Sequence, residues 1–190
     1  GEFIEFDKVI STIPLPIVAE IIPDLPKDIL SMFKSKINIA GVCVIVKLSK
    51  PLTNNFWLNT NDDEMDIPGI IEYSNLNPEV GHIVYVPYYM PQSNEKYKEG
   101  DEIFIKKVSS YFKKINPNIK DEDILDMKVN RYHFAQPICE PNFLETLPDA
   151  KLPVNGLWVA DTSYYYPEDR GISESIDYGR NLAKRVISDS

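Results

Sequence analysis

The stretch INIAGVCVIVKLSKPL, residues 37–52, limits the possible folds more than any other part of the chain. It is rich in β-branched residues and almost continuously apolar, which is typical of a strand buried on at least one face. Farther on, GIIEYSNLNPEVGHIVYVPYYMP predicts a hairpin with strands near 70–74 and 82–89, joined by a turn over 75–81. The middle of the chain is therefore predicted to form a β-sheet.

Helices are predicted between the strands. Two short helices follow an opening strand near residues 9–13 and are interrupted by Pro23 and Pro26. A longer helix is expected over 101–115, and a further strand follows near 127–135. The pattern is strand-rich with inserted helices and does not alternate strictly, which predicts an α+β fold: one mixed β-sheet with flanking helices.

The last part of the chain predicts an irregular, proline-rich run over 137–153, a short strand in GLWVA, and a final helix over about 171–187. Apolar and small residues recur along this helix at intervals of four, three, four and three, which defines one helical face. That face is expected to be buried, with its small residues close to a neighbouring backbone. Its members are Ile172, Ile176, Gly179, Ala183 and Val186.

Charge and composition exclude several classes of protein. The formal net charge of −9 disfavours nucleic-acid binding, because no basic surface is available for phosphates. No apolar run approaches the roughly 18 residues of a membrane span, and the first residues do not resemble a signal peptide. The two cysteines, Cys43 and Cys139, are expected to be free thiols, and the protein is expected to be cytoplasmic.

Several kinds of chemistry lack their usual motifs. None of the eight glycines forms a G-x-G pair, so no phosphate-binding loop is predicted within the chain. His82 and His133 lie far apart, and no metal site is predicted. No catalytic residue can be named from the sequence.

Two segments resemble a known superfamily. DKVISTIPLP, residues 7–16, is similar to a segment of flavin-dependent amine oxidases, protoporphyrinogen oxidases, phytoene desaturases and UDP-galactopyranose mutases. The segment GLWVADTSYYYPEDRGISESIDYGRNLAKRV resembles the C-terminal motif of the same superfamily, and RYHFAQPICEPNFLETLP resembles its penultimate strand and loop. The order of the elements matches over most of the chain.

This resemblance implies a C-terminal fragment of an FAD-dependent oxidoreductase. Residues 1–16 would form the crossover strand from the FAD lobe, residues 17–153 the substrate-binding domain, and residues 154–190 the strand, loop and helix of the FAD site. The partners implied are a small-molecule substrate and an N-terminal Rossmann FAD-binding domain outside this chain. FAD is expected in the full-length protein, whereas the isolated fragment is expected to lack the cofactor and to be inactive.

The resemblance also implies cofactor-binding residues. The start of the final helix, at Gly171 and Ile172, would direct N–H groups at the pyrimidine edge and ribityl chain of the flavin. Asp161 or Thr162 would supply the contact made by the family's acidic residue, since this chain has Ala-Asp-Thr where the family usually has Ala-Gly-Asp or Ala-Gly-Glu. Arg170 would lie near the flavin or an anionic substrate.

Substrate contacts are predicted at Tyr88, Arg131 and Tyr165. Structural alternatives stay open for all of these sites: Asp161 as a turn residue, Arg170 in a surface ion pair, and the tyrosines as loop or strand packing. An alternative function is a stand-alone, non-catalytic domain that binds carbohydrate or peptide.

Overall fold

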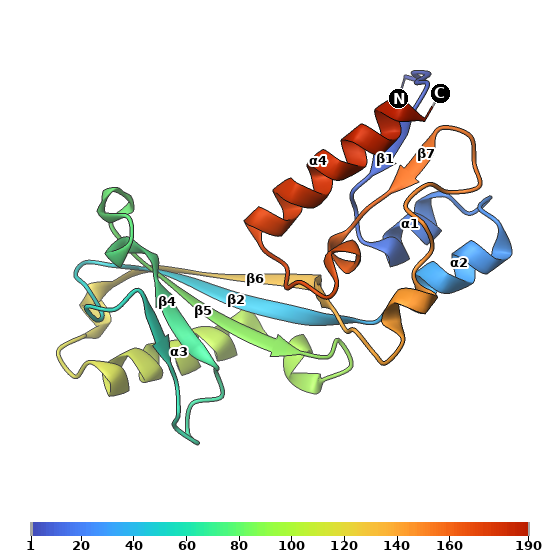
Figure 1. Cartoon of the computed structure of the whole chain (residues 1–190). Coiled ribbons are helices and arrows are strands. Elements are labelled where there is room, and N and C mark those ends of the chain that lie inside the picture. The colour runs from blue at the N-terminus through green and yellow to red at the C-terminus, as the bar shows by residue number, and fades with distance from the viewer. Residues whose placement is uncertain (1, 190) are drawn as a thin grey trace. The chain divides into compact units, whose positions relative to one another are not determined.

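The computed structural model describes residues 2–189, which divide into two compact units (Figure 1). One unit runs to Asn38 and resumes at Gln136, and the other spans Ile39–Ala135. Both boundaries lie inside the segment predicted as the substrate-binding domain, residues 17–153. The assignment of the three predicted segments to a substrate domain and a flavin lobe therefore stays a prediction.

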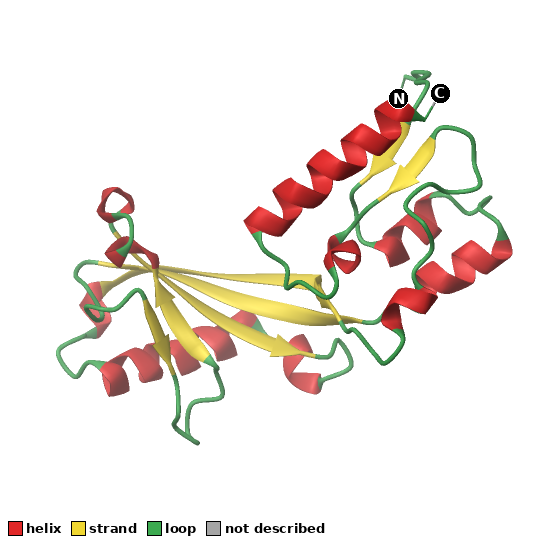
Figure 2. Cartoon of the chain, viewed as in Figure 1, coloured by secondary structure: helices red, strands yellow, loops and turns green. Residues whose placement is uncertain are grey.

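The Ile39–Ala135 unit is built on a five-stranded sheet with the strand order β3-β4-β5-β2-β6 (Figure 2). The strands are β2 (Asn38–Leu48), β3 (Trp57–Asn59), β4 (Gly69–Glu72), β5 (His82–Met90) and β6 (Ile124–Pro137), of which β2 and β6 extend slightly beyond the unit. The predicted hairpin is confirmed, because β4 pairs antiparallel with β5. Strand β3 was not predicted.

One face of this sheet is covered by α3 (Asp101–Ile115). Alternate residues of β2 and β5 are buried, as expected for strands with one face against a core. Val44 and Val86 are opposite each other in the register and fully buried with Phe104 and Phe112 of the helix. The unit thus has its own hydrophobic core.

The second face of the sheet has no helix packed on it among the described residues of this unit. Cross-strand pairing aligns Trp57 with Ile71, Ile71 with Tyr85, and Tyr85 with Ile45 across four strands on this face. Trp57 is 53% exposed, and the ring of Tyr73 meets that of Tyr85 edge-on at 6.3 Å. An apolar, aromatic row is therefore accessible on the sheet.

The other unit contains a two-stranded parallel sheet of β1 (Val9–Ser11) and β7 (Leu157–Val159). Helices α1 (Leu15–Ile21) and α2 (Lys27–Lys34) and part of β7 share a hydrophobic cluster that includes Phe33, and α4 (Ile172–Ser188) follows β7. Gly156 precedes β7 with φ +73°, and a Cβ there would collide with the carbonyl oxygen of Asp7. Glycine is therefore required where the two strands come together.

The α+β class predicted from the sequence is confirmed, with the strands arranged in two sheets instead of one. The two short helices are also confirmed, and they lie on either side of Pro23 and Pro26. No helix within residues 2–189 is both long and apolar enough to cross a membrane.

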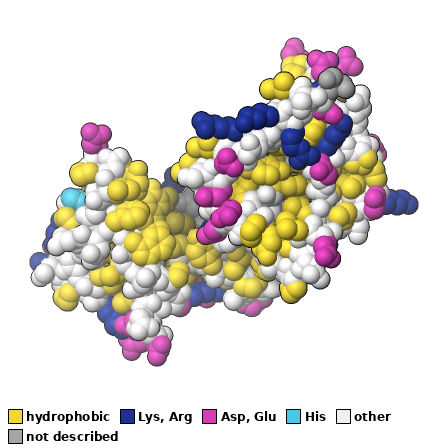
Figure 3. Space-filling view, in the orientation of Figure 1, with side chains coloured by type: hydrophobic (Ala, Val, Ile, Leu, Met, Phe, Trp, Pro, Cys, Tyr) yellow, Lys and Arg dark blue, Asp and Glu magenta, His cyan; other side chains and the backbone are white. Residues whose placement is uncertain are grey.

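The predicted buried face of α4 is only partly correct: Val186 is buried as predicted, whereas the two isoleucines are exposed and the buried Leu182 was not predicted. The buried residues of this helix are Leu182 and Val186, which pack with Trp158 and Ala150, and Tyr178 is partly buried beside them. Ile172 is 82% exposed and Ile176 is 50% exposed. Nothing described lies within 4 Å of a Cβ built at Gly179. The isoleucine stripe is therefore on the outer side of α4, and Figure 3 shows hydrophobic side chains at the surface of the unit.

Two alanine substitutions on α4 distinguish these faces. We expect Leu182→Ala to lower the free energy of unfolding by about 2–4 kcal/mol, because it leaves a cavity beside Trp158. The matched change Ile176→Ala, on the exposed stripe, should alter it by less than about 0.5 kcal/mol. Urea unfolding measures both, and equal losses would contradict the assignment of the buried face.

Candidate functional site

The residues predicted to bind a cofactor lie in the segment from the end of β7 to the first turn of α4. A 3₁₀ turn, η6 (Thr162–Tyr165), follows β7, and a loop then leads to Gly171, the N-cap of α4. Asp161, Thr162, Arg170, Gly171 and Ile172 thus lie in one continuous stretch of one unit.

Asp161 holds the backbone of this unit together. One carboxylate oxygen accepts a hydrogen bond from the N–H of Ser163 at 2.9 Å, and the other accepts one from the N–H of Leu15, the first residue of α1, at 3.0 Å. This is the turn role that the sequence left open, extended by a contact with a segment far away in the sequence. Thr162, the next residue, is exposed.

The start of α4 has no side-chain cap. Gly171 is extended, with φ −146° and ψ 170°, a conformation available to any residue. A Cβ at this position would collide with the carboxylate of Glu174, which therefore lies beside the helix N-terminus. Ile172 projects into solvent, and the backbone N–H of Arg170 donates to Asp169 at 2.8 Å. Polar N–H groups of the first turn are thus near the surface.

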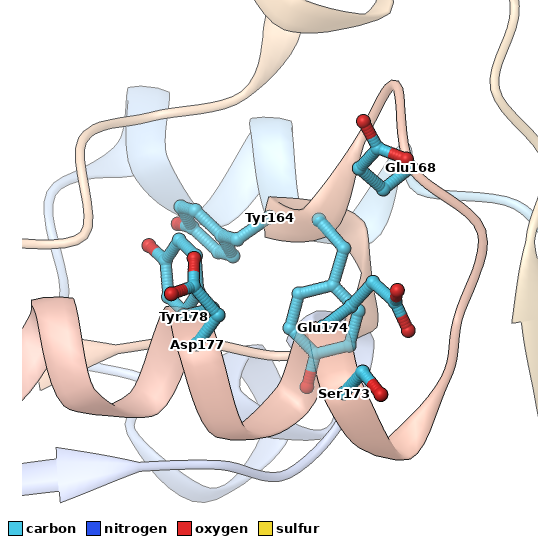
Figure 4. A pocket seen from close by; sticks show the side chains of 7 residues that line it. Tyr164, Glu168, Ser173, Glu174, Asp177 and Tyr178 are labelled. Carbon is cyan, nitrogen blue, oxygen red and sulfur yellow. The ribbon is translucent and has the colours of Figure 1, made fainter.

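A pocket of about 300 Å³ lies between η6 and the first turns of α4 (Figure 4). The ring of Tyr178 is 5.9 Å from that of Tyr164 and 5.8 Å from that of Tyr165. The hydroxyl of Tyr164 donates to the carbonyl of Pro148 at 3.1 Å, and burial raises its pKa. The remaining lining residues are Glu168, Ser173, Glu174 and Asp177.

The charge of this pocket is negative. Its three carboxylates belong to Glu168, Glu174 and Asp177, and within residues 2–189 none of them lies within salt-bridge distance of a lysine or arginine. Carboxylates accept hydrogen bonds from hydroxyl groups but repel phosphates. The pocket is therefore suited to an uncharged polyhydroxyl chain or to a cation.

Two of the predicted substrate residues lie in the other unit. Tyr88 of β5 is 1% exposed and packs edge-on against Phe104 of α3 at 5.1 Å. Arg131 of β6 also lies over the Phe104 ring, donates to the carbonyls of Tyr97 and Glu99, and pairs with Asp101. Both side chains are on the helix-covered face of the sheet. Tyr165, the third residue, lines the pocket beside α4.

Lys36 is a polar residue that the sequence did not single out. It is 7% exposed, its Nζ donates to the Thr146 hydroxyl at 2.6 Å, and it lies 4.7 Å from the centre of the Phe143 ring. Burial lowers its pKa, although the charges of Glu140 and Asp161 act in the opposite direction. Its position after α2 gave no signal, because a lone lysine at the end of a short helix is usually exposed.

The fold is similar to parts of larger enzymes of known structure. A candidate protoporphyrinogen oxidase from Exiguobacterium sp. 255-15 matches 95% of this chain with a TM-score of 0.65 and 14% sequence identity. An oxidoreductase from Methanosarcina mazei matches 83% with a TM-score of 0.60 and 19% identity. A reduced UDP-galactopyranose mutase matches 77% with a TM-score of 0.56 and 15% identity.

The chain spans 41%, 38% and 33% of the lengths of these three proteins, respectively. Protoporphyrinogen oxidases and UDP-galactopyranose mutases are both among the groups that the sequence resembles. That resemblance is confirmed at the level of the fold. No protein-family model and no curated protein sequence matches the chain.

Lys36→Met tests the buried lysine through the pH dependence of stability. A lowered pKa means that the unfolded chain binds this proton more tightly than the folded chain, so folding is favoured as pH rises toward the ordinary value of 10.5. We therefore expect the stability of the native protein, relative to Lys36→Met, to increase as the pH is raised from neutral toward the ordinary pKa of 10.5. Urea unfolding across this range measures it.

Lys34→Met is the control for this experiment, because Lys34 lies at the end of α2 with an exposed side chain. A difference between native protein and Lys36→Met that stays constant with pH would rule out the assigned role of burial.

Proposed function

We propose that this chain supplies the substrate-binding domain and part of the flavin site of an FAD-dependent oxidoreductase. The fold similarity to part of three enzymes supports this proposal, as does the predicted motif at the end of the chain. The observation that carries it is the incomplete sheet of β1 and β7, beside which α4 exposes a stripe of isoleucines.

The edge of β1 is available to a partner. Val9 and Ser11 form backbone hydrogen bonds with the residues that flank β7, Gly156 and Ala160. The N–H and C=O of Ile10, between them, therefore point away from β7. Within residues 2–189 no strand pairs with this second edge. Parallel sheets are usually larger and covered on both faces. We therefore propose that the sheet of a Rossmann FAD-binding domain continues from β1, and that this domain covers the exposed stripe of α4.

The residues around α4 suit one part of the cofactor. The first N–H groups of the helix would donate to the pyrimidine carbonyls of the flavin, and the carboxylates of Glu168 and Glu174 would accept hydrogen bonds from the ribityl hydroxyls. These carboxylates do not suit the pyrophosphate, which the partner domain would bind. When bound, FAD would accept a hydride as a C–N or C–C bond of the substrate is oxidised, or would assist sugar chemistry as in the mutases.

Substrate binding is the second part of the proposal. The uncovered aromatic row Trp57, Ile71 and Tyr85 provides an apolar surface suited to one wall of a substrate cleft. Tyr165 would make a separate substrate contact, in the pocket beside α4. For Tyr88 and Arg131, the predicted substrate contact requires a ligand on the helix-covered side of the sheet.

The cofactor part is tested with the full protein encoded by the gene. We expect that protein to purify with FAD and absorb near 450 nm, and Gly171→Val to lower its flavin occupancy severalfold through a steric block at the start of α4. Valine is compatible with the extended backbone at this position, so folding should be retained. Absorbance at 450 nm per polypeptide gives the occupancy.

Urea unfolding of the same variant is the control, since an unfolded protein would also lose flavin. A colourless full-length protein with no affinity for FAD would overturn the proposal and favour the alternative of a stand-alone carbohydrate- or peptide-binding domain. Unchanged occupancy in a folded Gly171→Val protein would remove this residue from the site.

A further inference from the structure

Lys36 carries a buried positive charge that no adjacent carboxylate neutralises. The residue is 7% exposed, and its Nζ donates one hydrogen bond, at 2.6 Å, to the Thr146 hydroxyl. That hydroxyl is neutral and itself donates to the carbonyl of Phe143 at 2.8 Å. Within residues 2–189 no carboxylate lies within salt-bridge distance of the Lys36 ammonium. Buried charges are usually paired directly, so this ammonium is a candidate functional group.

The ammonium lies beside the segment proposed to bind the flavin. The centre of the Phe143 ring is 4.7 Å from the Lys36 Nζ and 5.7 Å from the centre of the Tyr166 ring. Tyr166 is the C-cap of η6, the turn that Asp161 caps at its start. All of these residues belong to one unit. Side-chain contacts thus connect Lys36 to the turn that begins with the proposed cofactor-binding residues.

The surrounding charges also connect Lys36 to this site. Burial lowers the pKa of Lys36. Three titratable side chains act in the opposite direction: Glu140, Asp161 and Cys139. Both carboxylate oxygens of Asp161 accept hydrogen bonds from backbone N–H groups, so Asp161 acts on Lys36 through space. The Lys36 charge therefore acts in turn on the end of β7, where Asp161 lies.

We propose that the buried charge of Lys36 raises the reduction potential of FAD bound beside Asp161. Reduction places negative charge on a flavin, and a positive charge held nearby in a buried position stabilises it more than a charge in water would. Lys36 also offsets the negative charge that Asp161 brings to the same place. This role rests on the proposed function, because it concerns the same cofactor site.

The full protein encoded by the gene, purified with FAD, is the material for the test. Its midpoint potential is measured against a reference dye. We expect Lys36→Met to lower the potential at neutral pH, because it removes the positive charge and keeps a long apolar side chain. Lys34→Met is the matched control, since Lys34 is exposed at the end of α2 and its charge is screened by solvent. That variant should keep the native potential.

Two further variants separate charge from packing. Thr146→Val removes the hydrogen-bond acceptor of Lys36 but leaves the ammonium in place, so the potential should stay close to the native value. Lys36→Arg keeps a positive charge and should also stay close to the native value at neutral pH.

The pH dependence provides an independent signature. Because burial lowers its pKa, the Lys36 ammonium loses its proton at a lower pH than an exposed lysine. The difference in potential between native protein and Lys36→Met should therefore shrink as the pH is raised from neutral toward 10.5. The difference between Lys36→Arg and Lys36→Met should persist, since a guanidinium stays charged. A Cys139→Ser background keeps the titration of the neighbouring thiol out of the comparison.

The results distinguish failure of this role from failure of the proposed function. A full-length protein without affinity for FAD would overturn both. Equal potentials in FAD-bound native protein and Lys36→Met would overturn only the role of Lys36, as would an equal fall in Thr146→Val, because packing would then be responsible. If Lys36→Met does not fold, native protein is compared with Lys36→Arg, and equal potentials across the whole pH range overturn the proposal.

Discussion

Parallel pairing of β1 with β7 is the interaction on which the rest of this unit depends. It aligns Val9 with Leu157 and Ser11 with Val159, joining segments almost 150 residues apart in the sequence. Once the strands are paired, the Asp161 carboxylate reaches the N–H of Leu15 and fixes the start of α1. Because η6 and α4 follow directly, the pairing also positions the tyrosine pocket. A single short sheet thus determines the geometry of the candidate cofactor site.

The two units carry different chemistry. The pocket beside α4 combines tyrosine rings with carboxylates that make no salt bridge within residues 2–189, which suits polyhydroxyl groups. In the Ile39–Ala135 unit, Tyr88 is buried beside the ion pair of Lys96 with Asp66, and its hydroxyl has no hydrogen-bond partner among the described residues. Burial accounts for this second environment, since the sheet and α3 exclude water from Tyr88 and Phe104. Each environment is formed within one unit and can be studied there.

Much of the fold was predictable from sequence because its patterns are local. The apolar run over 37–52 predicted β2, and the hairpin pattern predicted β4 and β5. Pro23 and Pro26 predicted the break between α1 and α2. Strand β3 was missed because three residues are too few for a periodicity. The face of α4 was predicted only in part, because packing against Trp158 buries Leu182 and Val186 near the end of the helix and leaves Ile172 and Ile176 at its start exposed.

The site was predictable only as a segment. Its motif identified residues 161–172, yet the bonds of Asp161 to Leu15 and the position of Glu174 beside Gly171 depend on three-dimensional contacts. Strand alternation puts Arg131 and His133 on one face of β6, and both contact Tyr97. It could not reveal that α3 covers that face. Lys36 had no pattern at all, because its burial results from Phe143 and Thr146, more than a hundred residues away.

Within the described part of the chain, no strand pairs with the outer edge of β1, and this affects how the protein behaves in solution. An open strand beside exposed isoleucines is a template on which a second copy can add by intermolecular strand pairing, and such edges promote aggregation unless they are covered. Solubility at high concentration would then depend less on the stability of either hydrophobic core than on a partner that covers the backbone of Val9–Ser11.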